Sequence, residues 1–270
     1  EELAVTVNST TADLVIFDDE LTPLQGKSIE DHLGVRVMDR SELILDIFAK
    51  RARSREAKMQ VELAQLQYLM PRLRRMWTHL SRIRGGIGLR GPGETQLESD
   101  RRLIGRRITT LRKRLRALDK ARLNRSKARE DEFQVALVGY TNAGKSSLLR
   151  ALSNRDVLVE DRLFSTLDSK IRTVELGDGF EAMVTDTVGF IRKLPHDLIA
   201  SFRSTLMEIE ESDLIIKVID ASSSNVEAHL ETIRDVFKSL KISAELELIV
   251  FNKIDLIDLD VLKRLKRNYP

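Results

Sequence analysis

Apolar residues recur at alternating spacings of four and three along two stretches near the middle of the chain. The first stretch contains Met59, Leu63, Leu66, Met70, Leu73, Trp77 and Leu80. The second contains Ile104, Ile108, Leu111, Leu115 and Leu118. Heptad spacing places apolar side chains along one side of a helix, and two such helices joined by a loop bury each other's stripe. The pattern predicts an antiparallel coiled-coil hairpin, and Pro71 is expected to interrupt or kink its first helix.

Two shorter apolar runs near the N-terminus predict strands. Leu14–Phe17 is expected to be a buried strand, and Val35–Met38 a second strand. Between them, Ser28 is a suitable N-cap for a short helix, and Gly34 is suited to end it. This β–α–β order predicts a small parallel α/β subdomain.

A glycine-rich turn follows a strand-like run, residues 133–138, in the C-terminal half of the chain. It has the form G-x-x-x-x-G-K-S and leads into a helix-like run. Backbone N–H groups of such a turn surround a phosphate, Lys145 can reach the outer phosphates, and the Ser146 hydroxyl can bind Mg²⁺. The alternative is a chance glycine-rich turn. We assign nucleotide contacts to Gly139, Tyr140, Thr141, Asn142, Ala143, Gly144, Lys145, Ser146 and Ser147.

A second motif follows the strand-like run at residues 181–185. An acid at the end of such a strand can hold Mg²⁺, usually through water, which makes Asp186 a metal candidate. Gly189 lets a backbone N–H approach a γ-phosphate without an obstructing side chain. We expect nucleotide contacts from Asp186, Thr187, Val188 and Gly189.

A third motif, Asn252-Lys253-Ile254-Asp255, follows the run at residues 246–251. It resembles the guanine-reading motif of GTPases, in which the carboxylate, here Asp255, accepts two hydrogen bonds from guanine. Adenine lacks that pair of donors, so a buried carboxylate would be left unpaired at a free-energy cost. Asn252, Lys253 and Asp255 are therefore predicted base contacts. Three such motifs, each at the end of a strand, resemble a Ras-like, P-loop GTP-binding domain.

A switch segment is expected between the first two motifs. GTPases need a threonine there whose hydroxyl binds Mg²⁺ and whose N–H contacts the γ-phosphate, and Thr166 is the candidate. The alternative is an ordinary solvated Ser-Thr turn. The predicted contacts of this segment are Phe164, Ser165, Thr166, Leu167 and Asp168. The predicted catalytic residues are Lys145, Thr166 and Gly189, and the predicted metal ligands are Ser146, Thr166 and Asp186.

Phe190 stands where Ras-like enzymes carry a glutamine that orients the attacking water. Its side chain can neither donate nor accept a hydrogen bond, which predicts slow intrinsic hydrolysis that needs help from a partner or from elsewhere in the chain. Arg162 and Arg192 lie near the switches, but surface arginines are common, and the sequence alone assigns neither as a catalytic arginine finger. His196 is expected to pack in a loop and not to act as a catalyst.

The charge of the chain is concentrated in one segment. Residues 41–130 carry 24 Lys/Arg against 9 Asp/Glu, a net charge of +15, whereas residues 1–40 and 131–270 each carry −6. From Arg101 to Arg129 there are 13 basic residues and one acid, Asp119. A solvated charged face is the ordinary alternative, but like charges four residues apart destabilise a helix. The segment predicts contact with nucleic acid, through the backbone of folded RNA more than by base stacking.

The tip of the predicted hairpin is the glycine-rich segment 85–94. Five glycines and a proline in ten residues argue against a helix there. The segment is either a flexible linker or a contact loop, and its Ile, Leu, Arg and Pro residues favour a contact loop.

Composition excludes some classes of protein. The chain of 270 residues has no cysteine, so it has no disulfide framework and no thiol chemistry. No apolar run approaches the roughly 20 residues of a membrane span. The expected localisation is cytoplasmic, with an organelle matrix and peripheral membrane association left open.

Several segments together resemble one family, the HflX family of ribosome-associated GTPases. They are Asp18–Leu21, Arg51–Glu56, Gln60–Leu66, the 85–94 loop, Val138–Ser146 and Asp186–Ile191. The resemblance covers essentially the whole chain. It implies an N-terminal α/β subdomain (residues 1–40), a basic helical hairpin (41–130) and a G domain (131–270). It also implies Mg²⁺ and GTP/GDP as ligands, the large ribosomal subunit and its rRNA as partners, and ribosome splitting or rescue as the role of GTP hydrolysis.

One departure and two alternatives accompany this resemblance. A G domain is expected to continue past Asp255 to a further guanine-binding loop and a final helix, and this sequence ends at Pro270 before them. A non-enzymatic, nucleotide-gated RNA-binding module is the competing interpretation. An RNA-modification GTPase is the third, but no nucleophile constellation supports it. The protein is expected to be a monomer.

Overall fold

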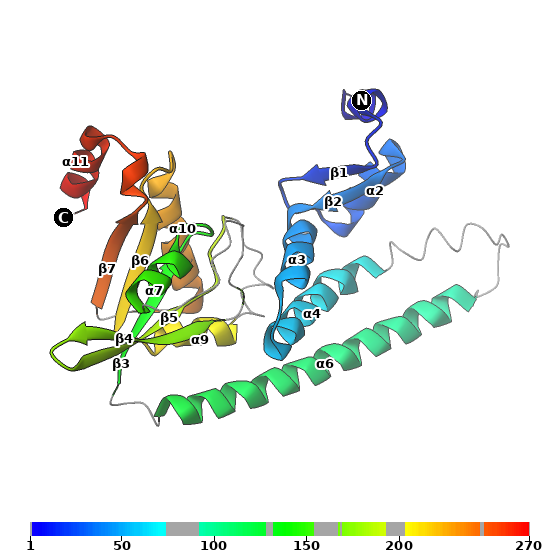
Figure 1. The fold of residues 1–270 in the computed structure, drawn as a ribbon. Helices are drawn as coiled ribbons and strands as arrows, with labels where there is room; N and C mark the ends of the chain where they lie inside the picture. Colours follow the sequence, from blue (N-terminus) through cyan, green and yellow to red (C-terminus); the bar gives the residue numbers. More distant parts are fainter. Residues whose placement is uncertain are drawn as a thin grey trace. The chain divides into compact units, whose positions relative to one another are not determined.

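The computed structural model describes residues 2–73, 92–127, 132–153, 167, 169–192, 203–243 and 246–269. Figure 1 shows the course of the chain through these elements. The chain divides into two compact units, residues 1–50 with 58–117 and residues 51–57 with 118–270. The architecture is mixed α/β, with a five-stranded sheet in the second unit.

The N-terminal part of the first unit is a small parallel α/β arrangement, as the sequence predicts. Its elements are α1 (Glu2–Thr10), β1 (Leu14–Phe17), α2 (Pro23–Leu33), β2 (Arg36–Asp39) and α3 (Arg40–Arg51). The strands β1 and β2 pair in parallel, with Leu14 opposite Arg36. The expectation that β1 is buried is wrong, since Ile16 is 50% exposed. A sheet of two strands leaves alternate residues of β1 facing solvent.

The helix α2 begins earlier than predicted. Its N-cap is Thr22, whose hydroxyl accepts from the Gln25 N–H while the Gln25 side chain accepts from the Thr22 N–H. Pro23 occupies the first helical position, where its missing N–H costs nothing. Ser28 lies inside the helix, so the N-cap prediction is wrong. Gly34 ends the helix with φ 70° and is confirmed as its C-cap.

Two helices of the hairpin are described: α4 (Arg55–Leu69), followed by the short 3₁₀ helix η1 (Met70–Arg72), and α6 (Pro92–Lys127). Their predicted apolar stripes meet, in a cluster of Met59, Leu63, Ile108, Leu111 and Leu115 with Leu66, Met70 and Ile104 packed against it. Glu62 pairs with Arg107, whereas Met70, eight residues further on, lies beside Gly105. The two helices are therefore antiparallel, as Figure 1 also shows.

Some details of the hairpin differ from the sequence prediction. Pro71 lies in η1, as expected for a residue that breaks an α-helix. Leu118 is 38% exposed and does not belong to the buried cluster. Trp77 and Leu80 lie outside the described residues. Of the glycine-rich segment 85–94, residues 92–94 form the start of α6, since proline is accepted in a first helical turn. The remainder is not described.

The second unit is built on a sheet with strand order β4-β5-β3-β6-β7. Its elements are β3 (Phe133–Gly139), α7 (Lys145–Ser153), β4 (Lys170–Gly177), β5 (Phe180–Asp186), α9 (Arg203–Glu210), β6 (Leu214–Asp220), α10 (Val226–Leu240), β7 (Leu246–Asn252), η2 (Ile254–Leu256) and α11 (Leu259–Asn268). Among the strands that the structure describes in this sheet, β4 alone runs antiparallel to its neighbour. The three strands predicted from apolar runs are all present, and the parallel strands end at one edge of the sheet.

The core of this unit forms where apolar strand residues meet the helices. Leu149 of α7 is fully buried against Val135 and Leu137 of β3. The helix α10 packs against β3 and β6 and buries Ile233 completely. These contacts fix the start of α7 and the flank of α10 beside the ends of the strands, where the predicted motifs lie.

Candidate nucleotide-binding site

The glycine-rich turn connects the end of β3 to the start of α7, as predicted. Two residues of the turn have a positive φ, Asn142 at 62° and Gly144 at 94°. A Cβ atom on Gly144 would lie 2.0 Å from the Asn252 side-chain nitrogen, and one on Gly139 would lie 2.2 Å from the Val218 carbonyl oxygen. Gly139 is therefore required by close packing against the backbone of β6, and Gly144 by its positive φ.

Lys145 is the first residue of α7 and is 6% exposed. Its ammonium group donates to the carbonyl oxygens of Gly139 and Tyr140, at 3.2 Å each. Burial lowers the pKa of Lys145 to about 8, and the nearby charge of Asp186 opposes this shift. The loop thus holds the amine close to the backbone groups that would surround a phosphate.

Ser146 and Asp186 meet at the end of β5. The Ser146 hydroxyl donates to Asp186 Oδ2 at 2.5 Å, and Asp186 is fully buried. The Thr187 hydroxyl donates to the Leu137 carbonyl oxygen at 2.7 Å, which fastens the end of β5 to β3. A hydroxyl and a carboxylate this close are hard oxygen donors of the kind that Mg²⁺ prefers, so the residues fit this metal.

The segment after Asp186 lies against the glycine-rich turn. The Phe190 N–H donates to the Gly139 carbonyl at 3.0 Å, and the Thr141 N–H donates to the Phe190 carbonyl at 2.7 Å. A Cβ on Gly189 would lie 2.7 Å from Thr141 Cα, so the backbone approaches this closely only with glycine there. The Phe190 side chain is 3% exposed and packs edge-on against Phe237, with ring centroids 6.5 Å apart.

The third motif adjoins the turn through Asn252. Its side-chain nitrogen donates to the Ala143 carbonyl at 2.9 Å. Lys253 forms an ion pair of 2.7 Å with Asp220, the last residue of β6. Asp255 lies in η2, beyond the end of β7, and is exposed in the free protein.

Asp220 is a residue of the site that the sequence analysis missed. Its second carboxylate oxygen accepts from the N–H and the hydroxyl of Ser222. Hydrogen bonds from Lys253 and Ser222 lower the pKa of Asp220, although burial acts in the opposite direction and is the largest single influence. The sequence contains a pattern that could have indicated this residue, since Asp220 is an acid at the end of an apolar run, as Asp186 is.

The predicted switch residues are only partly described. Leu167 is buried at 2% exposure, whereas Phe164, Ser165, Thr166 and Asp168 lie outside the described residues, as do Arg162 and His196. Arg192 is described, and its backbone N–H donates to the Tyr140 hydroxyl at 3.2 Å.

In the described part of the chain no three His, Cys, Asp or Glu residues gather as a metal cluster. Within the same residues, no helix is long and apolar enough to cross a membrane.

Comparison with known families matches almost every part of the chain. Residues 1–49 match a family described as "GTP-binding GTPase N-terminal", and residues 51–129 match "GTP-binding GTPase Middle Region". Residues 134–253 match "50S ribosome-binding GTPase". A solved structure titled as an SsGBP and GDP complex shares 29% sequence identity and a TM-score of 0.54, covering 98% of this chain and 73% of that one.

Two curated relatives are much more similar in sequence. GTPase HflX of Caldanaerobacter subterraneus is 51% identical over 261 residues, which are 96% of this chain and 61% of that protein. GTPase HflX of Escherichia coli is 48% identical over 259 residues, 95% of this chain and 61% of that protein. The chain therefore spans about three fifths of the length of these relatives.

The fold and the site define the class of protein. The chain contains the G domain of a P-loop GTPase. Its features are a strand, a G-x-x-x-x-G-K-S turn around a buried lysine, an acid on the neighbouring strand and an Asn252 side chain that contacts the turn. Together with the N-terminal and middle regions, these features place the chain in the HflX family of GTPases.

Proposed function

We propose that this protein binds and hydrolyses GTP with Mg²⁺ and that it does so on the large ribosomal subunit, where it acts in ribosome splitting or rescue. The single observation that carries the nucleotide part is the convergence of Lys145, Ser146 and Asp186 at the start of α7. The buried ammonium group and the 2.5 Å hydroxyl–carboxylate contact lie at one helix N-terminus, which favours phosphate.

The roles of the residues follow from their positions. Lys145 would exchange its two carbonyl partners for phosphate oxygens. Ser146 and Asp186, with Thr166 as the switch ligand, would hold Mg²⁺ directly or through water, and the metal would neutralise charge on the outer phosphates. Gly189 would offer its N–H to the γ-phosphate. Asn252 braces the loop, and Lys253 and Asp255 would contact the guanine base.

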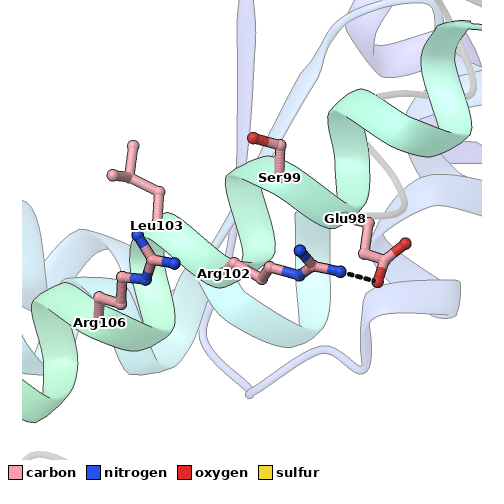
Figure 2. A pocket seen from close by; sticks show the side chains of 5 residues that line it. All are labelled: Glu98, Ser99, Arg102, Leu103 and Arg106. Carbon is pink, nitrogen blue, oxygen red and sulfur yellow. Dashed lines mark hydrogen bonds and ion pairs between the residues drawn. The ribbon is translucent and has the colours of Figure 1, made fainter.

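The partner proposal rests on the surface of α6. Its exposed basic residues are Arg101, Arg102, Arg106, Arg107, Arg112, Lys113, Arg114, Arg116 and Lys120. A surface pocket of about 380 Å³ lies on this helix. Figure 2 shows the side chains that line it, Glu98, Ser99, Arg102, Leu103 and Arg106. Arg102 is partly neutralised there by Glu98, at 2.8 Å. A face of this charge fits the phosphate backbone of RNA. The description of the matched family, "50S ribosome-binding GTPase", supports the ribosome as the source of that RNA.

A second candidate function is a nucleotide-gated RNA-binding module with negligible turnover. Phe190 favours it, because a side chain that is 3% exposed and packed on Phe237 cannot orient water. The two candidates differ in whether the ribosome supplies the missing catalytic group.

The deciding experiment is GTP turnover with and without purified large ribosomal subunits, at two salt concentrations. Strong stimulation that weakens with salt is expected for a ribosome-activated enzyme that docks through its basic helix. Binding without stimulation would favour the module. The Lys145→Ala variant is the control, since it should abolish nucleotide binding, and unchanged GTP affinity in it would overturn the site assignment.

A further inference from the structure

Tyr140, in the glycine-rich turn, is stacked on a residue far away in the sequence. Its ring lies parallel to the imidazole of His229, with centroids 4.0 Å apart and an interplanar angle of 15°. His229 belongs to α10, a helix anchored in the core by Leu230 and Ile233. A stacked pair this close fixes the direction in which the Tyr140 hydroxyl points.

That hydroxyl contacts the segment that follows Gly189. It accepts the Arg192 backbone N–H at 3.2 Å, two residues beyond Phe190. The Tyr140–Phe190 bridge, with its main-chain bonds of 3.0 and 2.7 Å, lies just before it. Three hydrogen bonds therefore hold residues 190–192 against the turn. Two of them join backbone groups, and the third is accepted by the Tyr140 side chain.

The same helix supports both sides of this connection. Phe237, two turns after His229 on α10, packs edge-on against Phe190. His229 Nδ1 is buried and has no hydrogen-bond partner among the described residues. Burial and the nearby Arg192 lower the pKa of His229, although Asp220 acts in the opposite direction. The lowered pKa favours the neutral form of the imidazole, which stacks on the Tyr140 ring without carrying a charge.

We propose that Tyr140 and His229 are positioning residues for GTP hydrolysis, which hold the Gly189–Arg192 segment on the phosphate-binding turn. This proposal rests on the proposed function and deepens it. The Gly189 N–H would contact the γ-phosphate, so its position depends on how firmly the backbone of the following residues is held to the turn. The stacked pair sets it by fixing the acceptor for Arg192, while Phe190 and Phe237 hold the other side of the segment.

The test uses the full chain and four variants. Tyr140→Phe keeps the stacked ring and removes the hydroxyl. His229→Ala removes the stacking surface, and His229→Phe restores an aromatic ring without the imidazole nitrogens. Tyr269→Phe is the matched control, since Tyr269 packs on Phe251 away from the glycine-rich turn. Each variant is assayed for kcat and KM with large ribosomal subunits, for GDP affinity, and for amide hydrogen exchange in residues 187–192.

Tyr140→Phe and His229→Ala should each lower kcat by about three- to tenfold, the factor that one neutral hydrogen bond or one aromatic pair is worth. GDP affinity should stay within about twofold, because both variants keep the backbone N–H groups of the turn that would surround the phosphates. Exchange in residues 187–192 should become faster in both variants, and His229→Phe should recover most of the loss in kcat. Tyr269→Phe should behave as the unmodified chain.

Two outcomes would overturn the proposal: unchanged kcat and exchange in both variants, or equal losses of kcat and GDP affinity, which would make the ring pair part of the pocket wall. If the unmodified chain shows no turnover on ribosomes, the proposed function fails separately. Hydrogen exchange then decides alone, because unchanged exchange in Tyr140→Phe and His229→Ala would show that the pair does not hold the segment.

Discussion

The contacts and the pKa values of single side chains in the nucleotide-binding site depend on residues that are remote in sequence. Lys145 contacts carbonyl groups five and six residues before it, yet its pKa also depends on Asp186, 41 positions later. Asn252 is separated from Ala143 by 109 positions and donates to it at 2.9 Å. The chemistry of the site is thus a property of pairs that only folding brings together.

The lowered pKa of Lys145 predicts a pH-dependent nucleotide affinity. Bound phosphate favours the ammonium form, so GDP binding takes up a proton above the pKa of about 8. Affinity should be constant below pH 8 and fall by up to about tenfold per pH unit above it. Meanwhile Lys145 should add to the stability of the free chain as pH rises from about 8 to 10.5, because its unfolded form then binds more protons.

The measurement is GDP affinity by fluorescence titration between pH 7 and 9.5, with stability by urea denaturation over the same range. Lys145→Arg is the control, because an arginine stays charged at every pH used. Whatever affinity remains in this variant should not decline with pH. A decline of equal steepness in both proteins would place the titrating group elsewhere.

Asp255 should distinguish guanine from hypoxanthine. ITP lacks the 2-amino donor, so it should bind about tenfold more weakly than GTP. This ratio is at the lower end of what one hydrogen bond to a charged group contributes, because Asp255 is exposed. In Asp255→Ala the preference should shrink toward one. Asp258→Ala removes a neighbouring exposed acid and should keep the full preference. Competition against a fluorescent GDP measures both ratios, and an unaltered preference in Asp255→Ala would refute the base-reading role.

At the scale of elements, the spacing of apolar residues along the sequence correctly predicted the hairpin helices and the strands before the motifs. The heptad spacing placed Met59, Leu63, Ile108, Leu111 and Leu115 in one cluster, as observed. The strands before each motif were likewise found. The prediction failed where two local signals competed: the capping pair of Thr22 and Gln25 with Pro23 starts α2 earlier than Ser28 would. The helices α1, α3, α9, α10 and α11 were not predicted.

The hairpin seam predicts a large effect of truncating its most buried residue. Leu111 is fully buried, so Leu111→Ala should lower the free energy of unfolding of the first unit by about 2–5 kcal/mol. Leu103→Ala on the same helix should change it by less than about 0.5 kcal/mol, since Leu103 is 66% exposed. Urea denaturation monitored by circular dichroism compares them, and equal effects would contradict the burial of Leu111 between the two helices.

At the scale of the whole molecule, charge is divided more sharply than composition suggests. The net charge of +3 conceals −6, +15 and −6 along the three sequence segments. The basic excess includes α6, which exposes nine Lys/Arg side chains within the residues 101–120. Such a helix should dominate the salt dependence of binding to a polyanion.

Neutralising part of that helix should lower both the affinity for large ribosomal subunits and its dependence on salt. The variant Arg112→Gln/Arg114→Gln/Arg116→Gln should reduce the slope of log affinity against log salt by about two to three, if each arginine contacts one phosphate. The control is Arg264→Gln/Lys266→Gln/Arg267→Gln, which removes as many exposed charges from α11. Sedimentation of each variant with large ribosomal subunits at four salt concentrations gives the two slopes. Equal slopes would show that α6 does not contact the ribosome.

The sequence by itself determined the class of fold, the order of the motifs and the antiparallel hairpin. These follow from hydrophobic periodicity, glycine spacing and charge, which are short-range properties of the chain. Tertiary structure alone decided that Asp220 pairs with Lys253, that Phe190 is buried on Phe237 and that Tyr140 stacks on His229. Each of these contacts joins elements whose register is set by packing in the core, and no local pattern encodes that register.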